Sequence, residues 1–250
     1  MLHKYLTLFA ALPLMAWASE PLPAAVQQVE KQGIKIIKEI KTEGGLRTWL
    51  GQYQDMGVTV WLTPDGKHAI SGYLYDEKGK NLSEEVFKNE LYIPQGRQLW
   101  QKLSTAEGIK EGNPAAKRKV VVFADPFCPY CKTFWAAAQP WIASGKVELN
   151  TLLVAVINPQ SGRYASAILS ADDPAKAWSA YELSNGKTLP PFPEKTSKAV
   201  FNAVQYHQQL MDETGANATP AIYYMNDNQE LQQVVGMPDE KQLAAMFGPQ

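Results

Sequence analysis

The pair Cys128 and Cys131, separated by Pro129 and Tyr130, constrains the fold of this 250-residue chain more than any other feature. The pair closely follows a run of five apolar residues, 120–124, which is typical of a buried central strand. Beyond it, apolar residues recur with helical spacing at Cys131, Phe134, Trp135, Ala138 and Ile142. The sequence therefore predicts a strand that leads through a short turn into a helix beginning at or near Cys128.

The chain has only these two cysteines. A disulfide used as a structural staple stabilises a protein by closing a long loop, and a bond between Cys128 and Cys131 would close almost none. A redox-active pair that needs no other cofactor is the better interpretation. A zinc site needs four ligands, and beyond residue 18 only His68 and His207 remain, in different predicted domains, so we expect no metal. A c-type haem would need histidine where Lys132 stands.

Residues 1–18 have the composition of a cleaved secretory signal peptide. Lys4 is followed by an apolar stretch, 5–17, and the small residues Ala16 and Ala18 precede polar Ser19 and Glu20. The apolar stretch is shorter than the roughly 20 residues that a membrane-spanning helix needs. We therefore expect export and cleavage, and in a bacterium the periplasm.

The charge of the predicted mature chain argues against some partners. The whole sequence has 24 Lys and Arg and 25 Asp and Glu, and removal of residues 1–18 takes away Lys4 alone. The net charge is then −2 and no basic block is present, so we expect neither nucleic acid nor an anionic membrane as partner. The remaining 232 residues are enough for two modest cores.

Residues 19–80 are predicted to form a first domain. A short helix carrying Val26 and Val29 stops at Gly33, and alternating segments then predict an antiparallel meander. Residues 63–66, Thr-Pro-Asp-Gly, are typical of a tight turn between two of the strands. A domain this small, with so little helix to cover its sheet, would be marginally stable as a monomer. We therefore expect it to pair with a second copy.

Residues 81–118 are predicted to connect this domain to the second. Asn81 can cap a helix, with Glu84 three residues later as in a capping box, and Pro94 must interrupt or restart that helix. The polar stretch 107–119 is predicted to be a loop.

Residues 119–250 form the second predicted domain. Strands at 120–124 and 147–157 flank the helix that begins near Cys128, and Pro140 is expected to kink or end this helix. A helical insertion at about 160–213, a hairpin of 221–225 with 231–235, and a final helix at 239–247 follow. This order predicts a thioredoxin-like domain with an insertion, and an α+β protein.

The two cysteines have different predicted roles. A thiol attacks as its thiolate, and the free N–H groups and positive dipole end at the start of a helix favour an anion at Cys128. Cys131, one turn later, should be more covered and should resolve the mixed disulfide that Cys128 forms. Pro129 suits the first turn of a helix, and with Tyr130 it should tune the relative stability of dithiol and disulfide.

Three segments resemble the DsbC/DsbG family of periplasmic thiol:disulfide interchange proteins. They are residues 53–59 (YQDMGVT), 123–131 (FADPFCPYC) and 215–224 (GANATPAIYY), and the similarity covers essentially the whole mature chain. Pro129 and Tyr130 between the cysteines, and the lack of a further disulfide, match the DsbG branch better than the DsbC branch.

The resemblance implies a V-shaped homodimer joined through cystatin-like N-terminal domains, and a cysteine pair kept reduced by a membrane reductase of the DsbD type. It implies disulfide reduction and isomerisation of cysteine-containing periplasmic proteins, and rescue of single cysteines oxidised to sulfenic acid. With the predicted thioredoxin fold, it also implies a cis peptide bond before Pro220, where Thr219 and Pro220 face the cysteine pair and offer backbone groups to an extended substrate.

Two other functions remain open, a net disulfide oxidase and a holdase chaperone for unfolded proteins. Several side chains also have two interpretations. Asp125 is expected to serve turn chemistry rather than proton transfer, and Lys132 to be a solvated helix residue rather than a partner of the thiolate. Trp135 and Trp141 are expected in the core. Of residues 223 and 224, both tyrosines, one should pack inward, and the other could contact substrate.

Overall fold

The computed structural model describes residues 21–42 and 45–249, so the predicted signal peptide lies outside the described residues. The chain divides into two compact units between Phe87 and Lys88. Over the described ranges, every helix is too short or too polar to cross a membrane.

The first unit contains the predicted antiparallel meander. Its strands hydrogen-bond in the order of the sequence, and each pair of neighbours is antiparallel. The elements are α1 (Ala24–Glu30), β1 (Lys35–Ile40), β2 (Thr48–Tyr53), β3 (Met56–Leu62) and β4 (Ala69–Gly72). Gly66 donates its backbone N–H to the carbonyl of Thr63, which closes the turn predicted between β3 and β4.

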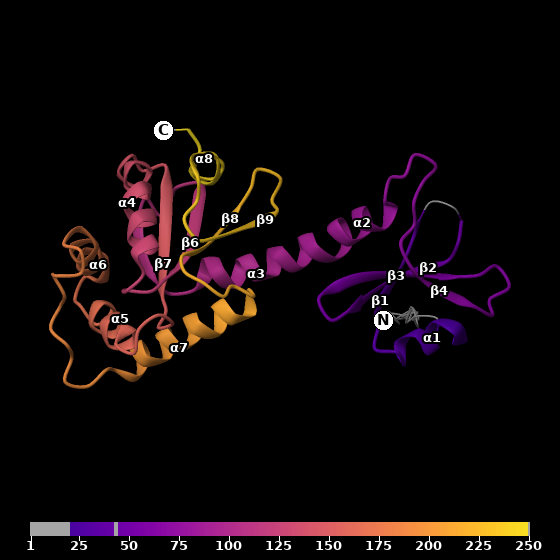
Figure 1. Cartoon of the computed structure of the whole chain (residues 1–250), viewed down its shortest axis with the longest axis horizontal. Helices are drawn as coiled ribbons and strands as arrows, with labels where there is room; N and C mark the ends of the chain where they lie inside the picture. Colours follow the sequence, from indigo (N-terminus) through magenta and orange to yellow (C-terminus); the bar gives the residue numbers. More distant parts are fainter. Residues whose placement is uncertain (1–20, 43–44, 250) are drawn as a thin grey trace, which may run out of the picture. The chain divides into compact units, whose positions relative to one another are not determined.

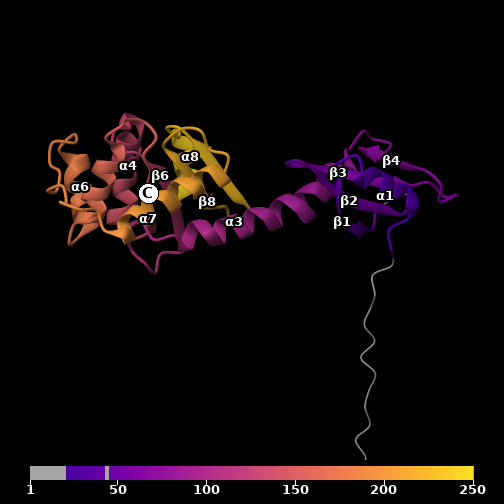
Figure 2. The ribbon, with the colours of Figure 1, turned by 90° about the horizontal axis from the view of Figure 1, so that it is seen from below.

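A small apolar core holds α1 against this sheet (Figures 1 and 2). Val26 and Val29 are the buried residues of α1, as their spacing predicts. They belong to one cluster with Trp49, Val60 and Leu62 of the strands. The unit also exposes large apolar side chains, among them Tyr53, Met56, Ile70 and Tyr73.

The predicted connecting helix is continuous but changes its hydrogen-bond pattern before Pro94. It consists of α2 (Leu82–Phe87), a π-helical turn η1 (Lys88–Tyr92) and α3 (Ile93–Thr105). Asn81 caps α2, because its side-chain oxygen accepts from the N–H groups of Ser83 and Glu84. Pro94 lies at the start of α3. At the first positions of a helix, the lack of a backbone N–H destabilises the helix least.

The second unit is built on a five-stranded sheet of order β5-β7-β6-β8-β9. Only β6 and β7 are parallel. The strands are β5 (Ile109–Gly112), β6 (Arg118–Ala124), β7 (Val147–Leu153), β8 (Ala221–Met225) and β9 (Leu231–Val235). The central β6 is the buried strand predicted before the cysteines, and the hairpin of β8 and β9 is also confirmed.

Helices cover both faces of this sheet (Figure 1). The side chains of β6 alternate between two cores: Val120 and Val122 pack with one, and Val121 and Phe123 with the other. The first core contains residues of α4 (Pro129–Ala143), α5 (Ser161–Leu169), α6 (Pro174–Leu183) and α8 (Glu240–Phe247), together with Val204. The second core contains residues of α3 and α7 (Lys198–Glu213). The predicted helical insertion is therefore α5, α6 and α7, between β7 and β8.

Two local predictions need correction. The segment 107–119 is not simply a loop, because Ile109–Gly112 forms β5, which pairs antiparallel with β7. As an edge strand with alternating burial and two polar residues, it lacks the apolar run by which β6 and β7 are recognised. Of the two effects expected of Pro140, the end of the helix is wrong, because α4 continues to Ala143, and the kink stays a prediction.

Candidate active site

Cys128 lies at the N-terminus of α4, as the sequence predicts. It is the N-cap residue in an extended conformation, and Pro129 is the first residue of the helix. Cys131 follows one turn later, and both cysteines are free thiols. The two side chains are 4% and 2% exposed, so both sulfurs lie in a poorly solvated setting.

The surroundings of Cys128 favour its thiolate. The backbone N–H of Cys131 donates a hydrogen bond to Sγ of Cys128 over 3.1 Å. The pKa of Cys128 is lowered to about 6, chiefly by a hydrogen bond from the Cys131 side chain, with Thr219 and backbone N–H groups adding to the effect against burial. A large part of Cys128 is therefore ionised at neutral pH.

Cys131 has the opposite character. Burial is the largest cause that raises its pKa, and the hydrogen bond to Cys128 and the Cys128 charge raise it further. At neutral pH the pair consists of one thiolate and one thiol. Such a pair can attack a disulfide with Cys128 while Cys131 stays protonated.

The loop before β8 brings Thr219 and Pro220 to the cysteines. The peptide bond between them is cis, as expected, and both residues are buried. In its protonated form, the Cys128 thiol donates to the carbonyl oxygen of Thr219 over 3.3 Å. In the part of the chain that the structure describes, the buried Thr219 hydroxyl has no hydrogen-bond partner, although its side chain lowers the pKa of both cysteines. This hydroxyl is a donor available to a charged sulfur.

Pro129 and Tyr130 are on the surface beside the buried sulfurs. Both are exposed, and the Tyr130 side chain is 61% exposed. The backbone N–H of Tyr130 is among the groups that lower the pKa of Cys128. The structure therefore brings all six predicted site residues together: Cys128, Pro129, Tyr130, Cys131, Thr219 and Pro220.

Asp125 anchors the loop that leads to Cys128. Its carboxylate is fully buried and accepts from the backbone N–H of Phe127 over 2.9 Å, which is the predicted turn chemistry. It also accepts from the Ser161 hydroxyl over 2.8 Å and from the N–H groups of Val156 and Ile157. These partners stabilise the carboxylate and fix the loop against the start of the insertion.

Two glutamates near the cysteines, one half-buried and one buried, were missed by sequence reasoning. Glu111 of β5 accepts from Nε1 of Trp135 over 3.0 Å and from the Ser179 hydroxyl over 3.1 Å. Glu182 of α6 is 3% exposed. The one sequence signal was spacing: Glu182 is four residues after Trp178, so it shares the buried face of its helix.

Burial decides between the interpretations of the remaining candidate side chains. Trp135 and Trp141 belong to the core, as predicted. The adjacent tyrosines 223 and 224 are both buried, on opposite faces of β8. Both rings therefore pack inward, and contact of one of them with substrate stays a prediction. Lys132 is half-buried and interacts electrostatically with Glu182.

The two histidines beyond residue 18 have surroundings of their own. His207 is buried and its ring nitrogens bond to the carbonyl oxygens of Leu153 and Glu107, whereas His68 is an exposed residue of the first unit. Within residues 21–42 and 45–249, no group of three or more His, Cys, Asp and Glu side chains is arranged to hold a metal ion.

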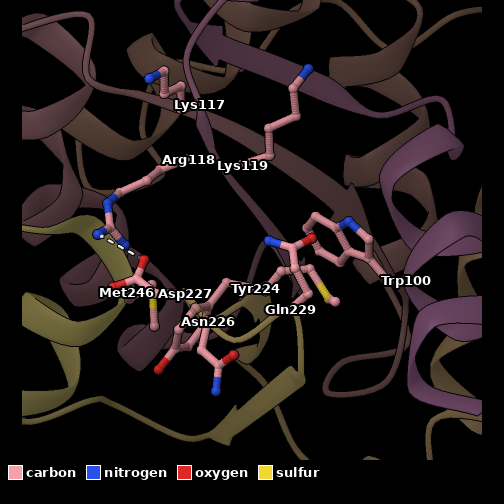
Figure 3. Close-up of a pocket in the computed structure, with 10 residues that line it drawn as sticks. Trp100, Lys117, Arg118, Lys119, Tyr224, Asn226, Asp227, Gln229 and Met246 are labelled. Carbon is pink, nitrogen blue, oxygen red and sulfur yellow. Dashed lines mark hydrogen bonds and ion pairs between the residues drawn. The ribbon is translucent and has the colours of Figure 1, made fainter. Parts of the chain in front are cut away.

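A cavity of about 400 Å³ lies at the other end of β6 (Figure 3). Lys117, Arg118 and Lys119 line it at the beginning of the strand, and Trp100 lines it from α3. Cys128 follows the end of β6, so this cavity is separate from the cysteine pair. Arg118 is partly neutralised there, because it forms an ion pair with Asp227 over 3.4 Å.

Two family models match the chain. A thioredoxin-like domain matches residues 106–248, and the N-terminal domain of disulfide bond isomerase proteins matches residues 17–84. The expected N-terminal domain and thioredoxin-like domain are thus confirmed.

Known proteins are similar over nearly the whole length. The thiol:disulfide interchange protein DsbG of Escherichia coli is 53% identical, over 98% of this chain and 98% of its own. DsbG of Pseudomonas aeruginosa is 39% identical, over 94% of this chain and 92% of its own. The DsbC protein of Escherichia coli is 25% identical, over 90% of this chain and 89% of its own. With its cysteine pair at the start of a helix, this chain is a thiol:disulfide oxidoreductase that belongs to the DsbG branch of the DsbC/DsbG family.

Proposed function

We propose that this protein is a periplasmic disulfide reductase and isomerase in which Cys128 attacks and Cys131 resolves. The observation that carries the proposal is the asymmetry of the two sulfurs. The pKa of Cys128 is lowered to about 6, whereas that of Cys131 is raised. One sulfur is therefore ready to attack at neutral pH, and the other keeps its proton until it is needed.

The reaction with a disulfide has two steps. The Cys128 thiolate attacks one sulfur of the client disulfide, which forms a mixed disulfide and releases the other client sulfur as a thiolate that takes up a proton. Cys131 then loses its proton and attacks Sγ of Cys128, which releases the second client thiol and leaves a Cys128–Cys131 disulfide. If a client thiolate attacks the mixed disulfide first, the client is isomerised and the pair stays reduced.

A client with a single cysteine oxidised to sulfenic acid fits the same sequence of steps. The Cys128 thiolate attacks the sulfenic sulfur, a mixed disulfide forms, and hydroxide leaves and is protonated to water. Cys131 then releases the repaired client thiol and forms the disulfide with Cys128. The net reaction converts one sulfenic acid and two thiols into one thiol, one disulfide and water.

Substrate contacts are assigned to the residues around the buried sulfurs. Thr219 and Pro220 lie beside Cys128, and the Thr219 carbonyl is already within 3.3 Å of its sulfur. Tyr130 offers an exposed ring next to the pair. We assign Thr219 and Pro220 to binding of the extended client, and Pro129 and Tyr130 to tuning of the cysteine pair.

The proposal includes a homodimer formed through the N-terminal unit. This unit exposes large apolar side chains around a cavity of about 360 Å³, whose lining includes Tyr53, Met56 and Tyr73. Exposed apolar surface of this kind is typical of protein interfaces. The proposal also includes a membrane reductase of the DsbD type that returns the pair to the dithiol, and no cofactor besides the cysteines themselves.

The test is capture of clients by a Cys131→Ala variant. Without Cys131, Cys128 should remain linked to its clients as mixed disulfides, which mass spectrometry would identify. Proteins with several disulfides would indicate isomerisation, and proteins with a single cysteine would indicate sulfenic acid reduction. A Cys128→Ser, Cys131→Ala double variant is the control. If the single variant captures no more protein than this control does, the proposed role of Cys128 is wrong.

A further inference from the structure

Glu182 is a buried acid that the two-sulfur reaction leaves unused. It lies in α6 and is 3% exposed, on the helix face that also carries Trp178. A carboxylate in such a place loses most of its hydration, which disfavours the ionised form. Burial accordingly is the largest cause that raises the pKa of Glu182, to about 8.

The face of α6 that carries Trp178 packs in the same core as Cys128 and Cys131. Three charged groups act on Glu182 there: Cys128 and Lys132 at the start of α4, and Glu111 of β5. The negative charges of Cys128 and Glu111 raise its pKa, whereas the positive charge of Lys132 lowers it. From α5, Tyr164 packs against the ring of Tyr181, the residue before Glu182. The Cys128 charge is the one member of this set that the redox reaction removes.

Two hydrogen-bonded links hold α6 in place beside the cysteines. The Tyr181 hydroxyl donates to the carbonyl oxygen of Pro126 over 2.9 Å, two residues before Cys128. Ser179 donates to Glu111, which also accepts from Nε1 of Trp135, one turn beyond Cys131. These links hold the backbone of α6, which carries Glu182, beside the loop and the helix that carry the cysteines.

We infer that Glu182 is a positioning residue that holds a proton while Cys128 is a thiolate and releases it when Cys128 enters a disulfide. The inference rests on the proposed function, because it takes Cys128 as the sulfur that alternates between these states. Two negative charges in one poorly solvated site repel strongly, so the thiolate is favoured opposite a neutral acid.

The proton balance follows from the charges. In the reduced protein, Cys128 is a thiolate, and Cys131 and Glu182 carry protons. When the client disulfide takes two electrons, Cys128 and Cys131 bond to each other, the Cys131 proton leaves, and the Cys128 charge disappears. Lys132 then acts on Glu182 without that opposing charge, so the pKa of Glu182 falls and release of its proton is favoured as well. Oxidation of the pair thus releases up to two protons instead of one.

The first experiment compares wild type with Glu182→Gln, which keeps the shape of the side chain and cannot ionise. Both proteins are equilibrated with glutathione redox buffers between about pH 6 and about pH 8, the range set by Cys128 and Glu182. A single-proton difference changes an equilibrium constant about tenfold per pH unit. Reduction of the variant should therefore become more favourable by about tenfold per pH unit, whereas wild type should change several-fold less, because Glu182 takes up the compensating proton.

Glu148→Gln is the matched control, because Glu148 is also a buried glutamate of this domain, on β7 and paired with Lys119. It should show the wild-type pH dependence. If Glu182→Gln and wild type share one slope, Glu182 does not exchange a proton with the redox state and the inference is wrong. If wild type does not exchange disulfides at all, the proposed function fails instead, so the two failures are distinguishable.

A second measurement needs no variant. Infrared difference spectra of reduced and oxidised wild type, with ¹³C-labelled glutamate, should contain a protonated carboxyl band in the reduced state that is lost on oxidation. The absence of any isotope-sensitive carboxyl band would overturn the inference even if Glu182→Gln does not fold.

Discussion

The sulfur of Cys128 lies 3.3 Å from the carbonyl oxygen of Thr219, a residue 91 positions later in the chain. The contact joins the first turn of α4 to the loop before β8. Because β6 pairs with β8, the sheet itself brings these two segments together. The reactivity of Cys128 should therefore depend on residues from both segments, and each dependence can be measured.

Replacement of Cys131 by alanine should raise the pKa of Cys128 from about 6 towards the usual value of a thiol. The hydrogen bond from the Cys131 side chain is the largest cause of the lowered pKa, and alanine removes it. The measurement is the ultraviolet absorbance of the thiolate against pH in the reduced proteins. An unchanged titration midpoint in Cys131→Ala would show that the helix N-terminus alone sets the acidity of Cys128.

Replacement of Thr219 by valine should also raise the pKa of Cys128 and slow its alkylation at neutral pH. The Thr219 side chain stabilises the thiolate, and valine has no hydroxyl to donate. Thr219→Ser is the control, because it keeps the hydroxyl. The rate of reaction with iodoacetamide should fall in the valine variant and stay near that of wild type in the serine variant. Equal rates in all three proteins would contradict this role.

The Cys128 thiolate should add increasingly to the stability of the reduced protein as pH rises between about 6 and about 9. The pKa of Cys128 is about 6 in the folded state and 9.0 for an unperturbed thiol, so folding favours the thiolate. This contribution is lost as pH falls through 6 and is complete above 9. At pH 7 it should reach about 1 kcal/mol relative to pH 5.

The free energy of unfolding in urea, measured for reduced wild type and Cys128→Ser at each pH, checks this prediction. The difference between the two proteins should grow with pH over that window. A difference that stays constant or shrinks would show that Cys128 has an ordinary pKa in the folded protein.

Replacement of Asp125 by asparagine should destabilise the catalytic unit by about 2–4 kcal/mol, because an amide group cannot accept from all the donors that the carboxylate serves. Ser161→Ala removes one of those donors and should cost about 1 kcal/mol. Urea unfolding of the oxidised proteins measures both effects. Normal stability of Asp125→Asn with loss of activity would instead indicate that Asp125 transfers protons.

The sequence was sufficient for the parts of the fold that depend on local patterns. The apolar run of β6, the cap residue Asn81 and the spacing of α4 each predict an element that the structure contains. β5 could not be found in this way, because an edge strand with Lys110 and Glu111 is stabilised by pairing with β7 rather than by its own composition.

The same distinction applies to the site. The positions of Cys128 and Cys131 follow from their spacing at the start of a helix. The anchoring of Asp125 does not, because its partners Val156 and Ser161 are 31 and 36 residues away. Glu182 was hidden for the same reason, since its neighbours belong to α4 and β5. Contacts made across the fold are visible only once the chain is folded.

The Thr219 hydroxyl has a thermodynamic consequence for the balance between the two oxidation states. A buried donor without an acceptor is unfavourable, and a sulfur anion is an acceptor that exists only in the dithiol state. When the sulfurs bond to each other, this acceptor disappears. A hydrogen bond from the Thr219 hydroxyl to the Cys128 thiolate would therefore favour the dithiol, the state from which the pair can pass electrons to a client.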